Sequence, residues 1–112
     1  MESRHAAAMY SLIEKNPDCD ILQSMPDEKT WWTVRKRCVQ MILHTDMTKH
    51  FEMVSKCELM CDMKGCVKEM RKGADPGSFS SDDDKQFLLN LILHASDISN
   101  PCKPLDVYKD WV

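Results

Sequence analysis

The chain has 112 residues, of which 43% are hydrophobic and 29% are charged, and its formal net charge is -3 at neutral pH. This length limits it to at most one domain, and the composition is that of a globular protein rather than a disordered one. The acidic balance gives no electrostatic basis for binding nucleic acid or anionic lipid, and no apolar run is long enough to cross a membrane. Because the N-terminus also lacks a secretory signal pattern, the six cysteines predict reduced thiols in a cytoplasmic protein.

The first half of the chain predicts two amphipathic helices. Residues 3–16 form the first, because their apolar positions recur at intervals of three and four residues. Those positions are Ala6, Met9, Leu12 and Ile13. Pro17 then ends the helix. The second helix runs to about His44, and Ser24 is its predicted N-cap, with Pro26 in the first turn.

The second half predicts two further helices joined by a loop. One helix runs from near Asp46 to about Arg71, and residues 72–77 form a loop because they contain glycine and proline. Ser81 is predicted to cap the next helix, because residues 82–84 are acids that suit a first helical turn.

This last helix is apolar on every face from Phe87 to Leu93, with only Asn90 interrupting, and Ala95 extends the apolar pattern. Such a helix is expected to be buried on all sides, which requires a ring of other helices. No alternating β-branched run predicts a strand. We therefore predict an all-α fold, with about four to six helices in this chain as part of a compact multi-helix domain. Residues 1–112 are predicted to be one part of that domain, its N- and C-terminal parts lying outside them.

Two groups of residues favour structural interpretations. The basic residues 35–37 lie within an amphipathic helix and are expected to form a solvated face. Cys57 and Cys61 share a helix face, and with Cys66 they offer three thiolates to a soft metal. Because such a site needs four ligands, packing of the thiols is favoured, and a cysteine metal site is the alternative.

The polar end of the apolar helix is a candidate functional site. His94 and Asp97 are three residues apart on one helix face, and Asn100 follows just before Pro101 ends the helix. A carboxylate after an apolar run is expected at the mouth of a buried region, where it needs a cation, a metal or several donors. Considered alone, Asp97 is equally well interpreted as a salt-bridged cap.

Two further acid–histidine pairs occur near helix ends. Asp46 lies four residues before His50, and Glu2 lies three residues before His5. Asp46 is interpretable as an N-cap that also pairs with His50. The histidines, taken singly, are interpretable as ordinary surface or packed residues.

Together, these segments resemble the class I cyclic nucleotide phosphodiesterases. Residues 94–101, HASDISNP, are similar to the family motif H-x-A/S-D-I/L-S-N-P. Residues 41–51, MILHTDMTKHF, are similar to its I-L-A-T-D-M-S-K-H-F segment. Residues 2–5, ESRH, are similar to its E-N-H-H segment, although an arginine replaces the first histidine. The pattern continues from Lys103 to Trp111, so the resemblance covers nearly the whole chain.

The resemblance implies an all-helical domain that hydrolyses 3′,5′-cyclic nucleotides, cAMP or cGMP, in signal transduction. It also implies two divalent metals, zinc and either magnesium or manganese. By position, Asp97 matches a direct ligand of the first metal, and Glu2 and Thr45 match residues that hold the water shell of the second. The residues that match positions against the purine are Asn100, Met47 and Ile98.

The same resemblance implies that much of the site lies outside this chain. The family's His-x-x-x-His and His-Asp motifs, with the other metal ligands and the general-acid histidine, precede the segment at Glu2. The glutamine that clamps the purine follows Val112. We therefore expect no catalytic residue and no hydrolysis from residues 1–112 alone. A homodimer is compatible with the family. The alternative is a non-catalytic helical or interaction module derived from it.

Overall fold

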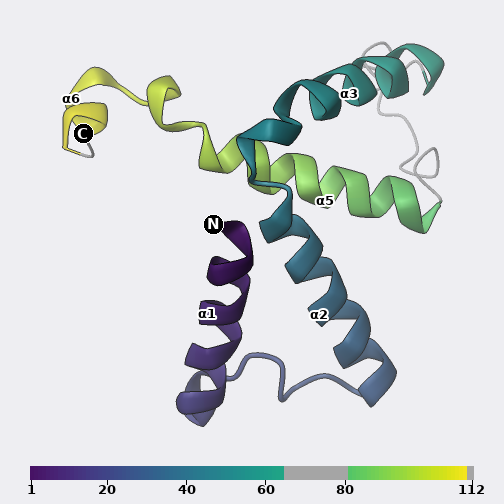
Figure 1. Ribbon diagram of the computed structural model, residues 1–112, viewed down its shortest axis with the longest axis vertical. Helices are drawn as coiled ribbons and strands as arrows, with labels where there is room; N and C mark the ends of the chain where they lie inside the picture. The colour runs from purple at the N-terminus through teal and green to yellow at the C-terminus, as the bar shows by residue number, and fades with distance from the viewer. Residues whose placement is uncertain (65–80, 111–112) are drawn as a thin grey trace.

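The computed structural model describes residues 1–64 and 81–110, and their regular structure is entirely helical (Figure 1). The α-helices are α1 (Glu2–Lys15), α2 (Glu28–Leu43), α3 (His50–Lys64), α5 (Asp82–Asp97) and α6 (Leu105–Lys109). Short 3₁₀ helices are η1 (Pro17–Cys19), η2 (Met47–Lys49) and η4 (Asn100–Cys102). The predicted all-α fold is thus confirmed for these residues. The expected continuation of the third helix to Arg71 and the loop at residues 72–77 lie outside them.

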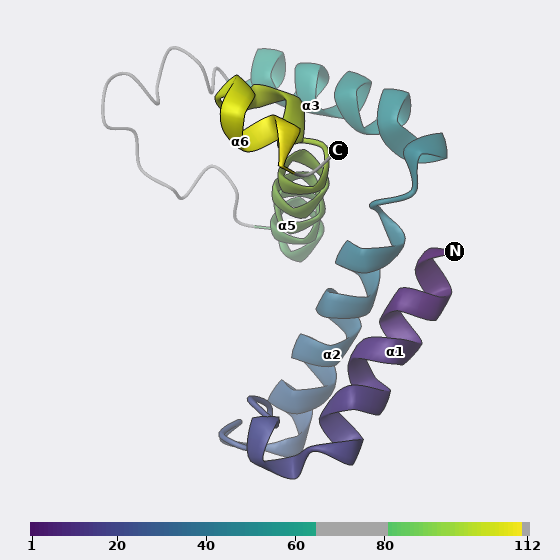
Figure 2. The ribbon, with the colours of Figure 1, turned by 90° about the vertical axis from the view of Figure 1, so that its left-hand side faces the viewer.

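Helices α1 and α2 lie side by side and are joined at one end through η1 (Figures 1 and 2). The Tyr10 hydroxyl donates a hydrogen bond of 3.3 Å to the Arg35 carbonyl. The Arg35 guanidinium lies 4.2 Å from the centre of the Tyr10 ring and 5.3 Å from that of Trp31, a cation–π arrangement. Arg35 is therefore half-buried between the helices, and the prediction of a solvated basic face was wrong at this position.

The N-cap of α2 is Asp27. The sequence had suggested Ser24, and that prediction was wrong. The Asp27 carboxylate accepts hydrogen bonds from the Thr30 backbone N–H at 2.7 Å and from the Thr30 hydroxyl at 2.9 Å. The Ser24 hydroxyl instead donates to the Ile21 carbonyl, within the preceding turn. The helix therefore begins after Pro26, where the Asp27 carboxylate meets two donors from one residue.

The Asp27 cap leads to a prediction about pH. The two Thr30 donors hold the pKa of Asp27 below its ordinary value of 3.8. The cap is therefore fully stabilising above that value and is lost as pH falls through the lower folded pKa. Asp27→Ala should lower the thermal unfolding midpoint by roughly 2–4 °C near neutral pH, and the deficit should shrink below pH 3.8.

Circular dichroism melts across this pH range provide the measurement. Asp27→Asn keeps a capping oxygen without the charge, so it should retain most of the stability at neutral pH. Ser24→Ala is the matched control and should change little. A larger loss from Ser24→Ala than from Asp27→Ala would contradict the assignment.

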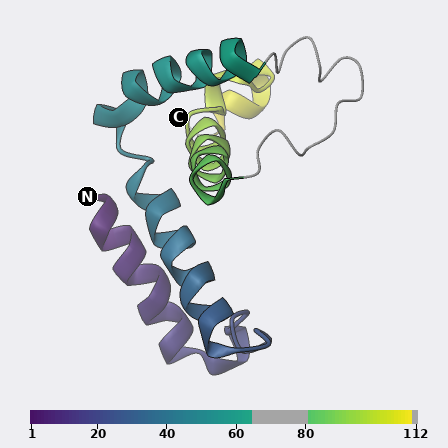
Figure 3. The same cartoon turned by 90° about the vertical axis from the view of Figure 1, so that its right-hand side faces the viewer.

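Helix α5 crosses the C-terminal half of α2 (Figures 2 and 3). At its N-terminus the Ser81 hydroxyl accepts from the Asp84 N–H at 3.0 Å, so the predicted cap is confirmed. Asp82 pairs with Arg37 of α2 at 3.3 Å in an exposed contact, which agrees with a solvated position for that arginine. Gln86 donates to the Arg37 carbonyl at 3.4 Å and to the Asn90 side chain at 2.8 Å. These contacts fix α5 against α2.

Only one face of α5 is buried in the described part of the chain. Phe87, Asn90 and His94 are 6%, 4% and 2% exposed, and their spacing of three and four places them on one stripe. Ile92, on another face, is 61% exposed. The expectation of burial on all sides is therefore not met within residues 1–64 and 81–110. None of the described helices is long and apolar enough to span a membrane.

Candidate functional site

Asp97 is the last residue of α5, and its side chain is exposed. The last turn is closed by its backbone, since the Ile98 N–H donates to the His94 carbonyl at 3.1 Å. Within the described ranges, no hydrogen bond or ion pair engages the Asp97 carboxylate. The sequence placed Asp97 at the mouth of a buried region, whereas the described chain leaves it open to solvent and available to a ligand.

Asn100 lies one turn beyond Asp97, at the start of η4. Its side-chain oxygen is buried and has no hydrogen-bond partner in the described part of the chain. An unsatisfied buried acceptor costs about 1–3 kcal/mol. The Asn100 amide therefore fits a site in which a further polar group completes its hydrogen bonding.

Thr45 and Asp46 form the turn between α2 and η2. The Thr45 hydroxyl donates to the Ile42 carbonyl at 2.8 Å, so its oxygen still has lone pairs to accept from water. Asp46 accepts from the Thr48 N–H at 2.9 Å, and the Thr48 donors hold the pKa of Asp46 below its ordinary value. Asp46 is thus an N-cap as predicted, but it caps η2 and is not paired with His50.

Glu2 begins α1, and its side chain is 27% exposed. Its own backbone N–H and then the Met1 amino group, 2.9 Å from the carboxylate, hold the pKa of Glu2 below its ordinary value. Burial and, to a smaller extent, the Asp46 carboxylate act on the pKa of Glu2 in the opposite direction. The N-terminal end of α1 lies near the connection between α2 and α3, which contains the Thr45–Asp46 turn (Figures 1 and 2). His5, on the same helix, is exposed.

Two apolar residues near these polar segments are open to solvent. Met47, in η2, is 56% exposed, and Ile98, the C-cap of α5, is 39% exposed. The structure thus leaves both apolar side chains uncovered by the described residues.

The donor chemistry agrees with part of a metal site. Carboxylates such as Asp97 and Glu2 suit hard divalent cations. Residues 1–64 and 81–110 nevertheless contain no group of three or more His, Cys, Asp or Glu placed to hold a metal ion. The residues present therefore fit a metal centre only together with ligands from elsewhere. Cys57 and Cys61 are half-buried, and Cys66 lies outside the described residues, so the cysteine alternative gains no support from them.

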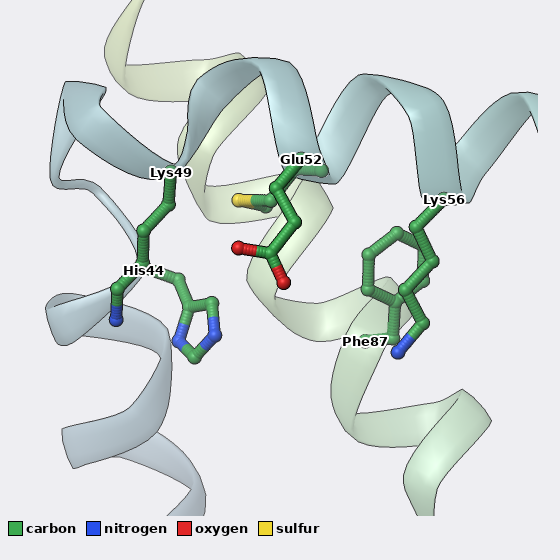
Figure 4. A pocket seen from close by; sticks show the side chains of 6 residues that line it. His44, Lys49, Glu52, Lys56 and Phe87 are labelled. Carbon is green, nitrogen blue, oxygen red and sulfur yellow. The ribbon is translucent and has the colours of Figure 1, made fainter.

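A separate hollow of about 230 Å³ lies between the end of α2, α3 and the first half of α5 (Figure 4). It is lined by His44, Lys49, Glu52, Met53, Lys56 and Phe87. In Figure 4 the Glu52 carboxylate lies between the side chains of Lys49 and Lys56. Lys49 lies in η2 and Lys56 in α3, so the hollow is lined by residues of mixed charge from both segments. No residue predicted for the functional site lines this hollow.

The sequence did not identify the contact between His50 and His94. Nδ1 of His50 lies 3.0 Å from Nε2 of His94, and this contact joins the first residue of α3 to the last turn of α5. The sequence could have predicted the burial of His94, because its spacing from Phe87 and Asn90 places all three on one stripe of the helix. Its partner, 44 residues away, required the tertiary structure.

Comparison with known proteins gives a consistent result along the whole chain. Residues 1–112 match the family model for 3'5'-cyclic nucleotide phosphodiesterase. The 3',5'-cyclic-AMP phosphodiesterase isoform F of Drosophila melanogaster is 37% identical over 114 residues, which cover 100% of this chain and 16% of the relative. Isoforms N/G from the same organism are also 37% identical, with 11% of their length covered. The chain thus spans about a sixth or less of these relatives. No solved structure matches it significantly.

Proposed function

The chain belongs to the 3',5'-cyclic nucleotide phosphodiesterase family, and from this membership we propose that its parent protein hydrolyses cAMP, cGMP or both to the 5′-nucleotide. The family match across all 112 residues is the observation that carries the proposal. The similar Drosophila proteins are named as cyclic-AMP phosphodiesterases, which favours cAMP as the first substrate to test. We place the enzyme in the cytoplasm, where its cysteines stay reduced.

We also propose that residues 1–112 are the central part of a larger helical domain. Large apolar side chains are exposed on several helices of the described chain, beyond what scattered surface residues require. They include Leu12 at 61%, Trp32 at 56%, Leu59 at 62%, Ile92 at 61% and Leu105 at 66%. Further helices packed on these faces would bury them and would bring the missing metal ligands.

In this proposal the carboxylate of Asp97 binds one divalent metal directly, because it is exposed at the end of a fixed helix. Glu2 and Thr45 accept hydrogen bonds from waters of a second metal, a role that suits an ionised carboxylate and a hydroxyl with free lone pairs. Two divalent metals held in such a site, zinc and magnesium or manganese, would supply a hydroxide at neutral pH and would neutralise phosphoryl charge. This chain contributes one direct ligand and the orientation of bound water.

The purine is proposed to lie between the end of α5 and η2. Asn100 has a buried side-chain oxygen without a partner among the described residues, and a polar purine edge or a neighbouring amide would meet it. Met47 and Ile98 offer exposed apolar surface to the purine faces. These residues do not discriminate adenine from guanine, so the choice between cAMP and cGMP is left to the assay.

The test uses the full-length parent protein loaded with zinc and magnesium. Hydrolysis of cAMP and of cGMP is followed by chromatography of the 5′-nucleotides, before and after removal of metal by a chelator. We expect turnover of at least one substrate, its loss on chelation, and its recovery when both metals return.

Two outcomes would contradict the proposal. A folded, metal-loaded parent that cleaves neither nucleotide would favour the non-catalytic helical or interaction module. Turnover unaffected by chelation would retain the hydrolase and remove the metal roles of Asp97, Glu2 and Thr45.

A further inference from the structure

His50 and His94, here called the histidine pair, form a close polar contact between α3 and α5. The 3.0 Å between Nδ1 of His50 and Nε2 of His94 is a hydrogen-bond distance, and the ring centres lie 5.3 Å apart. His94 is only 2% exposed, whereas His50 is half-buried. A polar contact shielded from water in this way is stronger and more directional than the same contact on the surface.

The histidine pair connects the two polar segments of the candidate site. His50 directly follows η2, whose N-cap is Asp46, next to Thr45. His94 lies one turn before Asp97, and its carbonyl accepts the N–H of Ile98, the C-cap of α5. The imidazole contact therefore joins the turn that presents Thr45 to the helix end that presents Asp97.

We propose that His50 and His94 are positioning residues that set the distance between Thr45 and Asp97. This inference rests on the proposed function, because it assigns the pair a role in holding two parts of one metal centre. Neither imidazole contacts metal or substrate in this role. Each acts through the backbone of its own segment, and groups that orient metal ligands indirectly are worth about 10- to 100-fold in metal affinity.

Each tautomer that permits the hydrogen bond leaves Nδ1 of His94 in need of a further partner. If His50 donates from Nδ1, a neutral His94 carries its proton on its own Nδ1; if His94 donates from Nε2, its Nδ1 is bare. In both cases Nδ1 of His94 needs a partner, and it is buried with none in residues 1–64 and 81–110. Simple apolar packing would not call for a buried imidazole at this position, with one nitrogen in a polar contact and the other in need of one.

The geometry gives a test with opposite outcomes at the two positions. The amide end of glutamine reaches about as far as Nε2 of histidine, and that of asparagine about as far as Nδ1. The contact uses Nε2 of His94 and Nδ1 of His50. Thus His94→Gln and His50→Asn should preserve the contact, whereas His94→Asn and His50→Gln should break it. All four replacements are neutral amides, so they are matched in polarity.

The experiment uses the full-length parent and Mn²⁺ as the probe, with free Mn²⁺ measured by electron paramagnetic resonance. His94→Asn and His50→Gln should weaken Mn²⁺ binding about 10- to 100-fold, and His94→Gln and His50→Asn by less than about threefold. The double change His50→Gln with His94→Asn should lose less than the product of the single losses, because both remove one interaction. Hydrolysis is measured alongside.

The outcomes separate this inference from the proposed function. If the wild-type parent hydrolyses and binds Mn²⁺ while all four variants bind it equally well, the positioning role is wrong and the enzyme proposal stands. If thermal stability changes in the crossed pattern but Mn²⁺ affinity does not, the histidine pair is structural only, which also overturns the role. If the wild-type parent neither binds Mn²⁺ nor hydrolyses, both proposals fail.

Discussion

Asp97→Ala in the full-length parent is expected to remove one tightly bound metal and to lower kcat/KM by about a thousandfold or more. The reason is that metal binding and phosphoryl charge neutralisation each supply several kcal/mol to the transition state, and about 4 kcal/mol corresponds to a thousandfold in rate. Because the Asp97 side chain is exposed and its carboxylate has no hydrogen bond or ion pair with another described residue, its truncation should leave the fold intact. Metal content by mass spectrometry and turnover of cAMP and cGMP are the measurements.

Asp83→Ala is the matched control for Asp97→Ala. Asp83 is an exposed aspartate on the same helix. It lies in the first turn of α5, whereas Asp97 is the last residue of the helix. It should keep metal content and turnover close to the wild-type values. Asp97→Asn, which keeps the size of the side chain and loses the charge, should fall between alanine and wild type. If Asp97→Ala retained both metals and full turnover, the ligand assignment would be wrong.

Local sequence signals predicted the four longer helices and the caps at Asp46 and Ser81, because these depend on neighbouring residues. Ser81 caps α5 as expected, since its hydroxyl and the acids that follow it meet the free N–H groups of the first turn. The N-cap of α2 was misplaced because Ser24 and Asp27 both suit the role. The donors of Thr30, which satisfy Asp27 at two oxygens, decide between them.

The candidate site was predictable in part. The motifs around Asp97 and Thr45 lie within short segments, so the sequence showed them directly. Their relation in space depends on contacts between distant residues, such as the histidine pair and the ion pair of Arg37 with Asp82, which are 44 and 45 residues apart. No periodicity encodes such pairings. The sequence also predicted burial of every face of α5, whereas the described helices cover only one face.

Phe87→Ala is expected to give the largest loss of stability among single changes within α5. The Phe87 side chain is 6% exposed and lies on the buried stripe, with the Lys56 ammonium 4.5 Å from its ring centre. Truncating a buried phenylalanine costs about 3–5 kcal/mol, because the lost transfer free energy adds to the cost of the cavity. The lower end of this range is expected, since one edge of the ring borders the hollow beside Glu52.

Hydrogen exchange of the α5 amides in the full-length parent measures the free energy of opening of this helix. Phe87→Leu, which keeps most of the volume, should cost less than about 1.5 kcal/mol. Lys56→Ala removes the cation and should cost only about 0.5–1 kcal/mol, so the two contributions can be separated. If Phe87→Ala changed α5 protection no more than Lys56→Ala does, the contact of α5 with α2 and α3 would not depend on this ring. The position of Asp97 at the far end of α5 would then have to be held by the histidine pair and the α2 contacts alone.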